Sequence, residues 1–218
     1  MRMTWASRAL VAGALAISAI SAMLPTALAQ PPGELPPLSG DVKPLVKPKQ
    51  GDDGIFHQAW FPSTFLELAD DYREAEAKGQ RFAVIFEQRG CIYCTKMHNE
   101  VLAQRYINEY VAKNFFIVQL DLWGAREVTD FDGTKMPEKA LAERWGVMFT
   151  PTIVFFKDGL TNDGKAWGQP LEVTRMQLGF GAATFIDMFG WIRAKIYEKD
   201  RNFQRFHVAR MIEREARK

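Results

Sequence analysis

Two cysteines separated by two residues, Cys91 and Cys94, constrain the fold of this chain more than any other feature. They follow residues 81–88, RFAVIFEQ, a mostly continuous apolar run that predicts a strand buried on both faces. Residues 94–114 then place apolar side chains at helical spacing, and Asn114 can end the helix. The pair is therefore predicted to lie where a buried strand passes into a helix.

This junction favours a reactive dithiol. Gly90 lets the chain turn, and Cys91 then lies at a helix N-terminus, where unpaired backbone N–H groups and the helix dipole favour a thiolate. Cys94, one turn into the helix, can attack a mixed disulfide on Cys91. We interpret Cys91 as the attacking sulfur and Cys94 as the resolving sulfur.

A structural staple is the first alternative for the two cysteines. Closing so short a loop restrains the unfolded chain by only about 2 kcal/mol. The chain has 2 cysteines in total, whereas exported proteins that depend on disulfides usually carry several. A non-catalytic binding module with a stapled turn is therefore disfavoured.

A metal site is the second alternative, because His98 lies four residues after Cys94. Two thiolates and an imidazole suit copper or zinc, so a metal carrier using Cys91, Cys94 and His98 is the rival function. A closed zinc site needs four ligands, and the two other histidines are remote in sequence. Haem attachment is excluded because Thr95 follows Cys94. We expect no metal and no cofactor beyond the redox-active disulfide.

The rest of the pattern predicts an α/β fold, with a central mixed β-sheet flanked by helices. Trp123 is expected to pack in the core, and residues from Ala183 onward to form one long, extended C-terminal helix. Other helices are expected over 64–79, where Thr64 and Glu67 form a capping box, and over 138–147; strands over 115–123 and 150–159; an edge strand within 160–182; and an inserted loop over 124–137.

The N-terminal residues predict export. Residues 1–29 combine Arg2 and Arg8 with an uncharged stretch and end in a small-residue cleavage site, as in a signal peptide, although an uncleaved anchor is the alternative. Residues 30–54 are proline-rich and predict an extended, poorly ordered linker, followed by one domain over 55–200 and a basic helical extension over 201–218. Without the leader the 26 basic residues that remain equal the 26 acidic ones, which gives no indication of nucleic-acid binding.

A second motif, Thr150-Pro151-Thr152, opens the apolar run IVFF. With the cysteine pair upstream, it resembles the thioredoxin superfamily, over roughly residues 65–197. The resemblance implies a thioredoxin fold in which Pro151 is cis beside the sulfurs and Thr150 offers its backbone to a substrate strand. Ile92 and Tyr93, between the cysteines, would also contact the substrate.

The segments FEQRGCIYCTKMH, VQLDLWG, VTDFDG and WGVMFTPTIVFF are similar to the SoxW-type exported thioredoxins of bacterial sulfur-oxidation systems. This resemblance implies a monomeric periplasmic protein that reduces disulfides of sulfur-oxidation or cytochrome-maturation proteins and is itself reduced by a membrane thiol–disulfide electron conduit.

The sequence departs from the thioredoxin pattern at two places. Ile92-Tyr93 replaces the familiar Gly-Pro, so the direction of electron flow stays open. The usual buried acid is replaced by Ile85, which leaves Glu87 as the candidate proton relay, with Asp121 a weaker candidate. The alternative for Glu87 is a solvated residue at the end of a strand.

Overall fold

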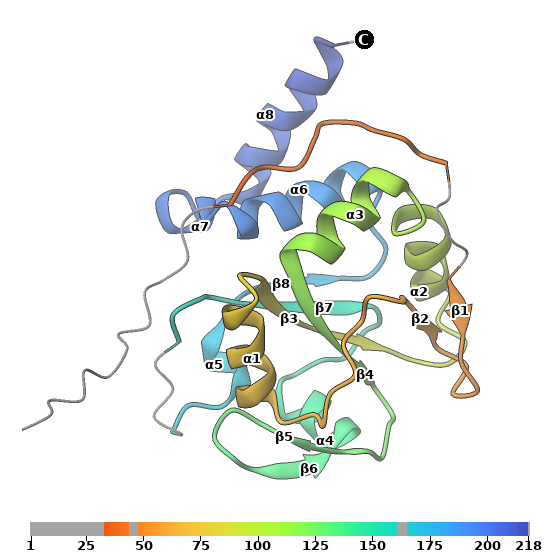
Figure 1. Cartoon of the computed structure of the whole chain (residues 1–218), viewed down its shortest axis with the longest axis vertical. Coiled ribbons are helices and arrows are strands. Elements are labelled where there is room, and N and C mark those ends of the chain that lie inside the picture. The colour runs from red at the N-terminus through yellow and green to blue at the C-terminus, as the bar shows by residue number, and fades with distance from the viewer. Residues whose placement is uncertain (1–32, 44–47, 161–164, 218) are drawn as a thin grey trace, which may run out of the picture.

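A four-stranded sheet in the order β4-β3-β7-β8 forms the centre of this computed structural model, which describes residues 33–43, 48–160 and 165–217 (Figure 1). The strands are β3 (Arg81–Glu87), β4 (Phe115–Asp121), β7 (Thr152–Phe156) and β8 (Glu172–Gln177). β3 and β4 are parallel, and the other two pairings are antiparallel. The predicted signal peptide, residues 1–29, lies outside the described residues.

The continuous apolar run of β3 is explained by burial of both its faces, as predicted. Phe82, Val84 and Phe86 point into one hydrophobic cluster, and Ala83 and Ile85 into another on the opposite face. Because successive side chains of a strand point to opposite faces, the central part of a strand in the middle of a layered fold must be apolar, as residues 82–86 are here.

Helices cover the sheet on both faces (Figure 1). The first cluster is closed by α1 (Leu68–Ala77) and α4 (Glu138–Arg144), and the second by α3 (Arg105–Asn114) and α6 (Ala182–Arg193). The predicted α/β fold with a central mixed sheet is therefore confirmed, with β8 at the sheet edge as expected.

The predicted capping box at Thr64 is wrong. Oγ1 of Thr64 accepts a hydrogen bond from the backbone N–H of Leu66, and Leu66 has a φ of 59°, so the chain turns before α1 begins at Leu68. The helix ends as predicted near Gly79, which has a positive φ of 69°.

The helix predicted over 94–114 is three shorter elements. These are α2 (Ile92–Lys96), the π-helix η1 (Met97–Val101) and α3, with a break around residues 102–104. The backbone N–H of Leu102 bonds the carbonyl of Met97, which closes the wide π turn at 2.8 Å.

The predicted single C-terminal helix is also wrong, because it is interrupted twice. The chain forms α6, then α7 (Ile196–Lys199), then α8 (Phe203–Glu215). Lys195 between α6 and α7 has a φ of 55°, and its Nζ forms an ion pair with Asp158 at 2.6 Å. None of the helices over the described residues is long and apolar enough to cross a membrane.

The inserted segment predicted as a loop over 124–137 contains a hairpin of β5 (Glu127–Thr129) and β6 (Lys135–Pro137). The turn after β5 is held by the buried carboxylate of Asp130, which accepts hydrogen bonds from Trp145 Nε1 and from the backbone of Gly168, where α5 (Gly168–Leu171) begins. The insertion is thus part of the packed domain.

The described part of the predicted linker lies on the domain instead of forming a poorly ordered tether. Residues 33–43 pass beside α8 and over α6 and α3 (Figure 1). Tyr110 donates to the carbonyl of Glu34, and Arg210 to that of Pro36. Further along, β1 (Lys49–Gln50) pairs with β2 (Phe56–His57) in a short hairpin.

Candidate active site

Cys91 and Cys94 form a disulfide at the end of β3, with a Cα–Cα separation of 5.2 Å. Cys91 is the N-cap residue of α2, and the backbone N–H of Cys94 donates to its Sγ at 3.0 Å. Cys91 is 8% exposed and Cys94 is 3% exposed. The predicted position between a buried strand and a helix is confirmed, and Cys91 is the more exposed residue of the pair.

Gly90 makes the turn into the helix possible. Its φ is 75°, and no atom lies within 4 Å of the position that a Cβ would take. A side chain would have space there, so the requirement for glycine comes from the left-handed backbone.

Two of the predicted substrate-contacting residues, Tyr93 and Pro151, line one groove. The Thr150–Pro151 bond is cis, as the family resemblance implies. Pro151 and Tyr93 line the same groove of about 280 Å³, and Ile92 is 70% exposed. Thr150 is buried directly before Pro151. The structure thus brings Pro151 and Tyr93 together, and the role of all four residues in binding substrate stays a prediction.

Two further apolar side chains line this groove, and two more are exposed shortly before Pro151. Leu178 and Phe180 line the groove with Tyr93, and Met148 and Phe149 are exposed just before Pro151. Sequence reasoning missed them, although apolar residues outside a strand, next to a proline, were an available signal. Exposed apolar residues gathered in this way typically mark an interaction site.

Glu87 is completely buried, so its interpretation as a solvated residue at a strand end is wrong. Its two carboxylate oxygens accept hydrogen bonds from His98 Nε2 and Gln119 Nε2, each at 2.8 Å. A cavity of about 40 Å³ is lined by Glu87, Cys91 and Cys94. That volume is enough for a water molecule, through which a proton could pass between Glu87 and a cysteine sulfur.

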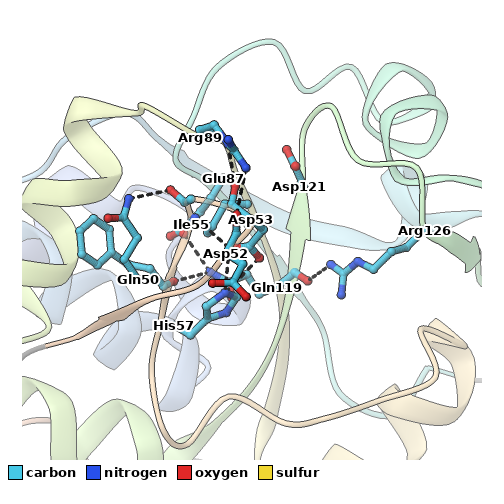
Figure 2. A network of polar contacts seen from close by, with 12 residues as sticks. Gln50, Asp52, Asp53, Ile55, His57, Glu87, Arg89, Gln119, Asp121 and Arg126 are labelled. Carbon is cyan, nitrogen blue, oxygen red and sulfur yellow. Dashed lines mark hydrogen bonds and ion pairs between the residues drawn. The ribbon is translucent and has the colours of Figure 1, made fainter.

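The β1–β2 hairpin forms another wall of this small cavity, a contribution that the sequence did not indicate. Gly54, Ile55 and Phe56 line it. Arg89, two residues before Cys91, holds the hairpin turn by donating to the carbonyls of Asp52 and Asp53, both at 3.0 Å (Figure 2).

The residues of the metal-carrier alternative do not come together as ligands. His98 has both ring nitrogens in hydrogen bonds, Nε2 with Glu87 and Nδ1 with Gln58, and the two cysteines are joined to each other. Within the described part of the chain, no three His, Cys, Asp or Glu side chains are grouped as metal ligands.

Asp121 is the last residue of β4, the strand beside Glu87, and Trp123 lies two residues beyond it. Trp123 is 69% exposed, so the prediction that it packs in the core is wrong; its Nε1 donates to Gln88 at 2.8 Å. Asp121 accepts a hydrogen bond from the backbone of Trp123 at 3.0 Å. It turns the chain at the end of β4.

Comparison with known proteins agrees with this geometry. Residues 68–165 match the family model for a thioredoxin-like domain. The described domain therefore has a thioredoxin-like fold, with the disulfide at the β3–α2 junction. No curated protein sequence matches the chain.

Solved structures with a similar fold include a thioredoxin-fold protein from Helicobacter pylori, with 18% identity, a TM-score of 0.48, and coverage of 64% of this chain and 87% of that one. A thioredoxin from Thermus thermophilus is 25% identical over 56% of this chain and 80% of its own, with a TM-score of 0.41. A DsbH oxidoreductase is 15% identical over 64% of this chain and 91% of its own, with a TM-score of 0.39.

Proposed function

We propose that this protein is a periplasmic thiol–disulfide oxidoreductase that reduces disulfide bonds of exported proteins. The observation that supports this most directly is the hydrogen bond from the backbone N–H of Cys94 to Sγ of Cys91, at the N-terminus of α2. In the reduced protein the same N–H and the helix dipole favour a thiolate at Cys91, and the thiolate is the nucleophile of disulfide exchange.

The reaction proceeds in two exchanges. The Cys91 thiolate attacks one sulfur of the substrate disulfide, which forms a mixed disulfide and releases the other substrate sulfur as a thiolate. Cys94 then loses its proton and attacks Sγ of Cys91, which forms the Cys91–Cys94 bond and releases the second substrate sulfur. Two electrons pass from the dithiol to the substrate. Glu87 accepts the proton of Cys94 through the small shared cavity and later returns it to solvent.

The groove beside Pro151 receives the substrate. An extended peptide can pair with the backbone at Thr150, next to the cis bond, while its side chains contact Ile92 and Tyr93. Main-chain pairing beside a groove that is lined mainly by apolar side chains, together with Lys96 and Glu100, accepts many sequences, as a general reductant requires.

The cellular setting is proposed from the leader-like residues 1–29 and from the resemblance to SoxW-type exported thioredoxins. The substrates are exported proteins of sulfur oxidation or cytochrome maturation, and a membrane thiol–disulfide electron conduit returns the protein to the dithiol state. The protein acts as a monomer with no metal and no further cofactor.

Substitution of each cysteine tests the mechanism. Cys91→Ser abolishes the reduction of insulin disulfides, because no attacking thiolate remains. Cys94→Ser still attacks but accumulates mixed disulfides, because no resolving sulfur remains. Each serine variant is the matched control for the other, since both lack the disulfide. Turnover retained by Cys91→Ser would refute the proposal, and the reduction potential of the pair decides whether reduction or oxidation is favoured.

A further inference from the structure

A chain of side-chain hydrogen bonds runs from α3 to the carboxylate of Glu87 and fixes the orientation of every group in it. It begins at the carbonyl of Leu102, which can only accept, so the atom of Asn108 that lies 2.8 Å away is the amide nitrogen. The same nitrogen donates to Gln58 at 3.1 Å, which makes the Gln58 atom facing Asn108 its oxygen.

The amide nitrogen of Gln58 therefore faces His98, 2.9 Å from Nδ1. An amide nitrogen can only donate, so Nδ1 of His98 carries a lone pair and the ring proton is on Nε2. His98 is thus a neutral imidazole whose Nε2–H donates to Glu87 at 2.8 Å.

The second donor to Glu87 is fixed in the same way. The amide group of Gln119 faces the carbonyl of Phe56 at 2.8 Å, which identifies the nitrogen, and this nitrogen donates to the other oxygen of Glu87. Both oxygens of Glu87 therefore accept a hydrogen bond from a neutral donor. An ionised carboxylate can accept both bonds, whereas the O–H of a protonated carboxyl group would face donors and no acceptor among these groups.

We propose that His98 is a positioning residue of the redox site: as a neutral Nε2–H imidazole, it orients the Glu87 carboxylate and keeps it ready to accept the proton of Cys94. This inference rests on the proposed function and assigns to its proton-transfer step a residue that does not touch the substrate. His98 is completely buried, so its hydrogen bond to Glu87 is not weakened by solvent.

Other charged or titratable groups lie around Glu87 on the neighbouring elements. Asp121 is its register partner on β4, Arg126 donates to the carbonyl of Gln119 at 3.1 Å, and the hairpin carries Asp53 paired with His57 at 3.1 Å (Figure 2). On α2 the cysteine pair lines the shared cavity. None of these groups changes in a variant of His98, so a difference from the wild type reports on the hydrogen bonds of His98 to Glu87 and Gln58.

The two exchanges can be followed separately with dithiobis(nitrobenzoate), a small aromatic disulfide. Attack by Cys91 on this probe releases one coloured thiolate, and attack by Cys94 on the mixed disulfide releases the second. In His98→Leu we expect the first release at the wild-type rate and the second slowed about tenfold near pH 6, because the carboxylate that has lost this donor is no longer held facing the cavity it shares with Cys94. The difference disappears at high pH, where Cys94 ionises without a base.

His98→Gln is the matched control, because its amide can donate to Glu87 and accept from Gln58. We expect this variant to release the second thiolate at a rate within about twofold of the wild-type rate. The inference would be overturned if the rate of the second release in His98→Leu equalled the wild-type rate at every pH. It would also be overturned if His98→Gln folded but released the second thiolate as slowly as His98→Leu. If the wild type itself never releases the second thiolate, the proposed function fails instead.

A measurement on the wild type keeps the inference testable even where the leucine variant does not fold. The nitrogen chemical shifts of His98 at pH 7 should show a neutral ring with its proton on Nε2. An imidazolium, or a proton on Nδ1, contradicts the orientation deduced for the chain and refutes the positioning role.

Discussion

Asp187 on α6 should be essential for holding the C-terminal helix α8 on the domain. Its carboxylate is completely buried and accepts hydrogen bonds from Arg214 at 2.6 and 2.7 Å, from His207 at 2.7 Å and from Arg210 at 3.0 Å. We expect Asp187→Asn to keep the shape of the side chain and remove the charge that these groups face.

The expected loss of unfolding free energy in Asp187→Asn follows from the burial of its partners. The side chains of Arg210 and Arg214 are 6% and 12% exposed, so loss of the carboxylate leaves poorly solvated cations without a counter-charge. Breaking a buried ion pair at one partner costs about 3–5 kcal/mol of unfolding free energy. Arg210 and Arg214 also donate to the carbonyls of Pro36 and Leu38, so the N-terminal segment loses support as well.

Urea unfolding at pH 7 measures the loss, and Asp200→Asn is the control. Asp200 pairs with Arg205, which is 73% exposed, and such surface pairs contribute about 1 kcal/mol or less. A loss in Asp187→Asn no larger than in the control would refute the reasoning.

The same pair of variants gives a pH test. Burial alone would raise the pKa of Asp187, but hydrogen bonds from Arg214, His207 and Arg210 hold it below its usual value. A lowered carboxyl pKa contributes stability that is present above the unfolded pKa of about 3.9 and is lost as the pH falls through the folded pKa. The difference between wild type and Asp187→Asn should therefore persist at pH 5 and shrink only in stronger acid.

Two further substitutions test burial elsewhere. Burial raises the pKa of Asp71 to about 6, and its Oδ2 has no hydrogen-bond partner among the described residues. The charge of Asp71 thus lowers the stability of the fold as the pH rises from about 4 through 6. Asp71→Asn should therefore stabilise the protein by up to about 3 kcal/mol at pH 7 but not at pH 3.5. Thermal unfolding at both pH values measures this difference. Gly168→Ala places a Cβ against the indole of Trp145, which is completely buried, and should cost about 1–3 kcal/mol in urea unfolding. Gly181→Ala, with open space around its Cβ, is the control and should be close to neutral; equal losses in the two variants would contradict the packing argument.

The centre of the fold and the disulfide could be predicted because local sequence determines them. An uninterrupted apolar run fits only a strand buried on both faces, and a cysteine directly after it must lie near the start of the next helix. The breaks in the C-terminal helix could not be predicted in this way. The apolar spacing continues through Lys195, and its left-handed backbone accompanies an ion pair with Asp158, which lies far away in sequence.

The support of the redox site was hidden from the sequence for the same physical reason. Glu87 could equally have been solvated, and what decides its burial is contact with Gln119 and with His98, whose own partner Gln58 is 40 residues away. A buried carboxylate without donors would be strongly unfavourable, so these distant amides and the imidazole had to be present together before the acid could remain there. A CxxC pair therefore indicates where the sulfurs lie, whereas the groups that set the protonation state around them depend on the tertiary structure.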